Sequence, residues 1–138
     1  MDPISVAAGC HALIIAVGSS TCCVRDFIVN CRDAHQDLAA VSRELSDLDM
    51  TLHILKDDTD ANGPNRLPKD LRQRICDIME NCNSVLVELE ALVKKFNSAG
   101  LDCTALWALS GRKDAAKIRS SLETHKGALG LVVEAVTL

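Results

Sequence analysis

The sequence predicts an all-α fold, an elongated helical bundle of four to five helices with an apolar N-terminal helix. Three observations support this prediction. Hydrophobic residues make up 48% of the chain but aromatic residues only 2%, whereas the strands of all-β domains favour aromatic and β-branched side chains. Apolar residues recur at steps of three or four, which is the period of an amphipathic helix. No Asp, Glu, Lys or Arg lies between Ile4 and Val24.

A chain of 138 residues is close to the usual domain size and is long enough to bury a core, so we expect one domain over residues 1–138. The net charge of −4 gives no cationic field that would draw the chain to phosphate. The scarcity of aromatic rings also removes the usual means of stacking bases. We therefore expect no nucleic-acid partner.

The first predicted helix covers residues 1–19. Asp2 can cap its free N–H groups, and Pro3 suits the first helical position. Apolar residues then cover nearly the whole circumference, which is typical of a helix that is buried on all sides or lies in lipid. Gly18–Thr21 is a cluster of turn-forming residues, and it predicts the end of this helix and a new N-cap.

Two interpretations of the N-terminal helix stay open. A secretory signal would need a basic leading region, and a permanent transmembrane helix needs about 20 apolar residues, whereas the strongly apolar stretch Ile4–Val17 has 14. The helix is then either part of a soluble core, or buried at rest and released to lipid on activation. In the second case the membrane-contacting side chains would be Ile4, Val6, Leu13, Ile14, Ile15 and Val17.

A long amphipathic helix is predicted over residues 20–58, because its apolar residues follow one another at helical steps. These residues are Val24, Ile28, Cys31, His35, Leu38, Val41, Leu45, Leu48, Leu52 and Leu55. Turn-forming residues and Pro64 then end the helix. A helix over 67–99 follows, with an apolar line made of Leu71, Ile75, Ile78, Cys82, Val85, Leu89, Leu92 and Phe96.

A short helix over 101–110 carries Trp107, and Ser110–Lys113 is predicted to break or kink the chain. The last helix covers 114–138. Its apolar line consists of Ala115, Ile118, Leu122, His125, Leu129, Val132 and Val136. Such lines in three long segments predict close interhelical packing of the coiled-coil type.

No residue pattern predicts catalysis, a cofactor or a metal site, and we do not expect an enzyme. Seven cysteines are present, an odd number without a C-x-x-C pair, and the four histidines are scattered. We expect reduced, packing cysteines and a reducing compartment. His125 is expected to be a core or boundary histidine. A further hypothesis is that the chain binds a small molecule in a pocket between helices, near His125 or Trp107.

One basic cluster allows two interpretations. Arg66, Lys69, Arg72 and Arg74 lie close together in the sequence, interrupted by Asp70. Such a cluster is typical of a solvated helix face. It would alternatively contact anionic lipid headgroups, where each cation contributes about 1 kcal/mol.

Several segments resemble the N-terminal domains of fungal STAND (NLR-like) receptors and the related HeLo-like domains. They are the opening MDPISVAAG, the stretch Val24–Leu55 with RDA and VSREL, the run WALSGRKD at Trp107–Asp114, and LETHKGAL at Leu122–Leu129. The resemblance covers nearly the whole chain and is weakest over 57–67. It implies a helical module that normally precedes a nucleotide-binding oligomerisation domain.

In some members of that family the module causes cell death by oligomerising and inserting its N-terminal helix into a membrane. That role would fall on Ile4–Val17, although Gly9, Cys10 and His11 weaken the segment as a membrane-inserting helix. The resemblance thus implies a cytoplasmic signalling module that is conditionally at the membrane. Its expected partners are a second copy, other signalling domains and, on activation, membrane lipid.

The alternative hypothesis is a passive helical scaffold that dimerises or docks a partner protein without lipid activity. The N-terminal helix decides between the two. A peripheral effector helix should be removable, so deletion of residues 1–18 should leave a folded bundle. Deletion of a core helix should unfold the protein.

Overall fold

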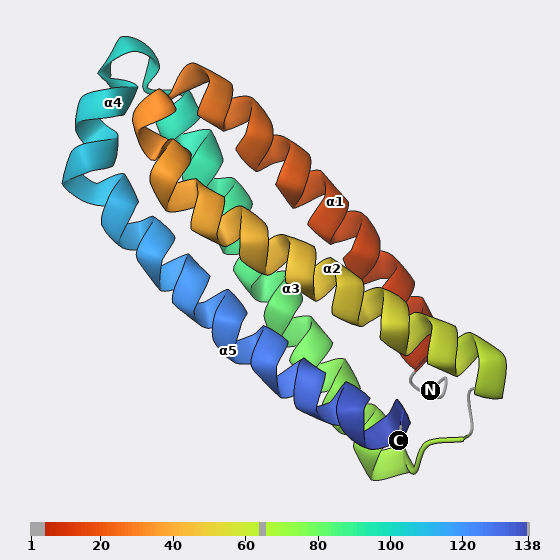
Figure 1. Ribbon diagram of the computed structural model, residues 1–138. Helices are drawn as coiled ribbons and strands as arrows, with labels where there is room; N and C mark the ends of the chain where they lie inside the picture. Colours follow the sequence, from red (N-terminus) through yellow and green to blue (C-terminus); the bar gives the residue numbers. More distant parts are fainter. Residues whose placement is uncertain (1–4, 64–65, 138) are drawn as a thin grey trace.

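The computed structural model describes residues 5–63 and 66–137, which form a four-helix bundle without a strand (Figure 1). The predicted fold class is confirmed. The long helices are α1 (Val6–Asn30), α2 (His35–Asn62), α3 (Lys69–Asn97) and α5 (Arg112–Thr137). Short helical segments join them at Arg32–Ala34, Gly100–Asp102, α4 (Cys103–Leu106) and a π-helical turn, Trp107–Gly111.

The long helices alternate in direction along the chain, and α4 lies at one end of the elongated bundle while the start of α1 and the end of α5 lie at the other (Figure 1). α1 packs against α2 and α3, and α5 packs against the same two helices. The helices therefore form a ring in the order α1, α2, α5, α3. Because each long helix has two principal neighbours, each must present a broad apolar face to the core.

The predicted apolar lines supply this core. On α2, the residues Leu38, Val41, Leu45, Leu48, Leu52 and Leu55 are all 0% exposed. On α3 and α5 the predicted residues are also buried, apart from half-buried Leu71 and His125. Across the α2–α5 interface, Lys126 contacts the carboxylates of Glu44 and Asp47 at 2.7 and 3.3 Å.

The predicted boundary between the first two helices is wrong. α1 does not end at residue 19 but continues through Gly18–Thr21 to Asn30, and the true break, Cys31–Ala34, lies inside the segment predicted as one helix over 20–58. Val24 and Ile28 therefore belong to α1, and His35 is exposed at the start of α2.

The hydroxyl groups of the expected N-cap have other partners, which explains why α1 continues. Ser19 and Ser20 donate hydrogen bonds to Oε1 of Glu90 on α3, at 3.1 and 3.4 Å. Thr21 donates to the carbonyl oxygen of Val17 at 2.8 Å, a pattern that is compatible with a continuous helix. None of these hydroxyls caps a new helix.

The end of α2 also lies later than predicted, at Asn62 and not at residue 58. Helical side-chain pairs extend this last turn, since Lys56 contacts Asp60 at 2.8 Å and Asn62 donates to the carbonyl of Asp58 at 3.0 Å. Gly63 ends the helix with a φ of 87°, which favours glycine.

The predicted break at Ser110–Lys113 is wrong: Ser110 and Gly111 end the π-helical turn, and Arg112 and Lys113 continue without interruption as the first residues of α5. Trp107 is 0% exposed and packs against Phe27 and Phe96, with ring centroids 5.5 and 5.3 Å away. Its indole Nε1 donates to Oδ2 of Asp37 at 2.9 Å. Gly111 lies under the same indole ring, and an added Cβ would lie 2.4 Å from Cε3 of Trp107.

We predict that Gly111→Ala lowers the free energy of unfolding by about 1–3 kcal/mol, because the added methyl group overlaps a buried ring that has no room to move. Urea denaturation measures this loss. Gly127→Ala on α5 is the matched control: its added Cβ meets no atom within 4 Å. We expect it to gain about 0.5–1 kcal/mol from helix propensity. Equal effects of the two substitutions would contradict the account of the Trp107 contact.

Candidate functional site

α1 presents two different apolar lines, one to the core and one to solvent. The inner line is buried and consists of Val6, Cys10, Leu13, Val17, Ser20, Val24 and Phe27. These residues are spaced alternately by four and three, as in a coiled coil. The helix that carries this line packs against α2 and α3, and Phe27 at its end also packs against Trp107. α1 is therefore a full member of the bundle.

Gly9 and Cys10, which weaken the segment as a membrane helix, fit the packing of α1 against α3. Cys10 is 0% exposed, and its Sγ lies 3.8 Å from Sδ of Met79. An added Cβ at Gly9 would lie 2.6 Å from Cε of the same methionine. The small residue thus allows the Met79 side chain to lie directly against α1.

The six predicted membrane-contacting residues do not share one face. Val6, Leu13 and Val17 are buried, Ile14 is half-buried and Ile15 is 60% exposed. Ile4 lies outside the described residues. The structure thus separates these residues into core positions and one prominent surface position.

The outer line of α1 faces solvent and has the same spacing as the inner line, two residues further along the chain. It consists of Ala8, Ala12, Ile15, Ser19 and Cys22, all of which are exposed. No member carries a charge, and the whole segment between Ile4 and Val24 has none, although Ser19 donates a hydrogen bond to the carboxylate of Glu90 on α3. We call these five residues the outer line. The sequence holds this second repeat too, but spacing alone could not tell which repeat faces the core.

By length and composition α1 could cross a bilayer, although core helices and signal sequences can pass the same test. Only 28% of its most apolar 18-residue window is buried, because the outer line and its neighbours face solvent. One apolar helix near the N-terminus is thus compatible with membrane association.

The four basic residues predicted to contact lipid have different surroundings in the structure. Arg66 donates to a carboxylate oxygen of Asp58 and to the carbonyl of Val136, so it joins the α2–α3 connection to the last turn of α5. Arg72 is half-buried, whereas Lys69 and Arg74 are exposed near the start of α3. The four residues lie at the end of the bundle opposite α4 (Figure 1).

Burial controls the chemistry of several thiols. It raises the pKa of Cys10 to about 12 and that of Cys82 to about 11. The pKa of Cys103 also rises to about 11, through burial and then a hydrogen bond with Cys31. These thiols stay protonated near neutral pH, as packing cysteines do. Within residues 5–63 and 66–137, no three His, Cys, Asp or Glu side chains gather as metal ligands would.

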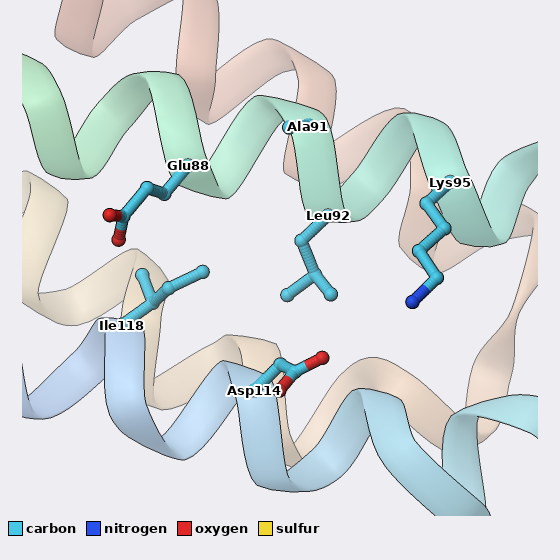
Figure 2. A pocket seen from close by; sticks show the side chains of 6 residues that line it. All are labelled: Glu88, Ala91, Leu92, Lys95, Asp114 and Ile118. Carbon is cyan, nitrogen blue, oxygen red and sulfur yellow. The ribbon is translucent and has the colours of Figure 1, made fainter.

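The grooves between the helices are shallow. Figure 2 shows one between α3 and α5, where Glu88, Leu92 and Lys95 extend from α3 toward α5, and Asp114 and Ile118 come from α5. Leu92 and Ile118 are 7% and 6% exposed and belong to the core. The groove brings charges of both signs together but no nucleophile and base, so it resembles an ordinary helix–helix junction.

Comparison with models of known protein families, with curated proteins and with solved structures gives no match. The resemblance to fungal STAND receptors therefore stays a prediction from sequence segments. The solvent-exposed apolar side chains of α1 and of the segment around α4 are the structural features that bear on function.

We predict that Leu13→Asp destabilises the fold by about 4 kcal/mol or more, because Leu13 is 3% exposed and the substitution buries an unpaired carboxylate. Ile15→Asp, two residues away, is the matched control. It should cost only about 0.5–1 kcal/mol, since its side chain is 60% exposed. Thermal unfolding followed by circular dichroism measures both, and deletion of residues 1–18 should abolish the cooperative transition. If Leu13→Asp were as mild as Ile15→Asp, α1 would not be a core helix.

Proposed function

We propose that this chain is a signalling and oligomerisation module of the kind found at the N-terminus of fungal NLR-like receptors, and that it self-associates through the outer line of α1. The observation that carries the proposal is this uncharged, solvent-facing line on a helix whose opposite face fills the core. Ile15, at its centre, is 60% exposed. Burial of such a face against a protein surface is favourable, since it removes apolar area from water.

A second copy of the chain suits this face. The chain carries a net charge of −4, so two copies approach most readily through a region without charge. The spacing of the outer line is also nearly symmetric about Ile15, which a two-fold axis requires of an interface. In an antiparallel pair, Ala8 of one copy would lie opposite Cys22 of the other, and the small residues at both ends would allow close approach of the helices.

Membrane perturbation by α1 is a second candidate, favoured by its length and apolar composition. For insertion, the inner line would have to leave α2 and α3. Its buried residues, Val6 to Phe27, hold α1 in the core, so release would require an activating signal. The alternative function is a passive helical scaffold, which dimerises or docks a partner protein and does not bind lipid.

We predict that sedimentation equilibrium finds a concentration-dependent dimer that Ile15→Asp weakens at least about tenfold, because the new charge would be buried without a partner. Val87→Asp on α3 is the control, since Val87 is 61% exposed and lies outside α1. Under mild oxidation Ala8→Cys should form a cross-linked dimer, and Ala8→Cys combined with Cys22→Ser should not. A monomer at all concentrations would contradict the proposal.

The membrane candidate makes a separate prediction. Because α1 is held in the core, vesicles filled with a self-quenching dye should leak only slowly on addition of the wild-type protein. Leakage should be faster for Ser20→Ala, which removes a hydrogen bond from α1 to Glu90. No leakage at micromolar protein, with or without anionic lipid, would contradict this candidate and leave self-association untouched.

A further inference from the structure

The end of the bundle formed by α4 and the π-helical turn exposes apolar side chains. We call residues Cys103–Gly111 the α4 tip. The tip contains no charged residue, and Leu106 and Leu109 on it are 41% and 80% exposed. No other large apolar side chain among the described residues is as exposed as Leu109. Figure 1 shows α4 at the far end of the bundle from the start of α1 and the end of α5.

The tip is held rigidly from within. Trp107 anchors it, because its indole ring is buried between Phe27 and Phe96 and its Nε1 donates to Asp37. The three rings are all the aromatic residues of the chain. The π-helical turn opens one residue after Leu106 and contains Leu109, and π-helical turns occur frequently at functional sites. The core thus fixes the direction in which the two leucines project.

Positive charge is concentrated directly behind the tip. Residues 103–122 contain four basic side chains, Arg112, Lys113, Lys117 and Arg119, and a single acidic one, Asp114, while Asp102 and Glu123 flank this stretch. All four basic residues are exposed, although the chain as a whole carries a net charge of −4. Lys113 follows Leu109 by four residues and Lys117 follows Lys113 by four, so these three side chains lie on one side of the chain. Arg112 lies 3.3 Å from Asp37 but stays 61% exposed.

We propose that the α4 tip docks this protein on the surface of an anionic lipid bilayer. Leu106 and Leu109 enter the boundary between headgroups and acyl chains, while Lys113, Lys117 and their neighbours meet the lipid phosphates. Lysines at this depth bury their methylene stems and keep their ammonium groups among the headgroups. The proposal goes beyond self-association and does not depend on it.

A lipid surface fits the tip better than a peptide or a folded partner does. A side chain that is 80% exposed lies on a convex surface, whereas peptides bind in grooves. The bilayer is deformable and presents charge over a wide area, so it suits a convex apolar tip with diffuse positive charge behind it.

The other basic cluster is less suited to this role. Arg66 is engaged by Asp58 and by Val136, and Asp70 and Asp77 lie beside the remaining cations. One cation of each cluster is ion-paired, Arg66 with Asp58 and Arg112 with Asp37, but Arg66 also donates to a backbone carbonyl and no exposed leucine precedes its cluster as Leu109 precedes Lys113. Because the two clusters lie at opposite ends of the bundle, variants of each can be compared directly.

The test is co-sedimentation of the full chain with vesicles of phosphatidylcholine, with and without phosphatidylserine. We expect binding to the anionic vesicles that weakens as salt rises. Lys113→Glu combined with Lys117→Glu should weaken binding about 100-fold, and Leu109→Asp about tenfold or more. The matched control is Lys69→Glu with Arg74→Glu, which changes the net charge equally at the opposite end and should leave binding within about threefold.

Three outcomes would overturn the proposal. The first is that the protein does not bind anionic vesicles. The second is that Lys69→Glu with Arg74→Glu weakens binding as much as Lys113→Glu with Lys117→Glu does. The third is that the protein binds neutral vesicles equally well with and without Lys113 and Lys117. Ile15→Asp separates this proposal from the proposed function. It should abolish dimers while the protein still docks, so loss of docking in that variant would place the lipid contact on α1 and contradict the role of the tip.

Discussion

The packing of the inner line of α1 into the space between α2 and α3 is the contact on which the rest of the structure depends. Each long helix has two principal neighbours, so removal of α1 would expose both of them at once. The line runs from Val6 to Phe27, and Phe27 in turn packs on Trp107 at the far end. The same helix therefore supports the core and, through this ring pair, the α4 tip.

Because the inner line fixes α1 in the core, the outer line of α1 is held at the surface of the bundle. A helix fixed in the core cannot also be free to insert into lipid at rest, but it can present a rigid, uncharged surface to another copy. The α4 tip instead carries the exposed side chains of Leu106 and Leu109, and the exposed lysines Lys113 and Lys117 follow it at the start of α5. The proposed pairing through α1 and the proposed docking through the tip would use separate surfaces, so the two proposals are compatible in one molecule.

Helical periodicity predicted most of the fold, because the apolar lines of α2, α3 and α5 are buried where their spacing places them. It misplaced the end of α1, since the hydroxyls at Ser19 and Ser20 are satisfied by Glu90, which lies about 70 residues away in sequence. The true break at Cys31–Ala34 contains neither Gly nor Pro, so no local signal marked it. The apolar character of α1 was predictable, but the division into an inner and an outer face depends on which neighbours cover it. The charge behind the tip was readable in the sequence, whereas the exposure of Leu109 required the fold.

The central claim is that α1 is a core helix in the resting molecule, and native-state hydrogen exchange tests it most directly. We expect the amides from Leu13 to Phe27 to exchange only by global unfolding, with the same opening free energy as the amides in the middle of α3. Exchange of the α1 amides at a clearly lower free energy, while α2, α3 and α5 stay protected, would show a detachable helix and contradict the account.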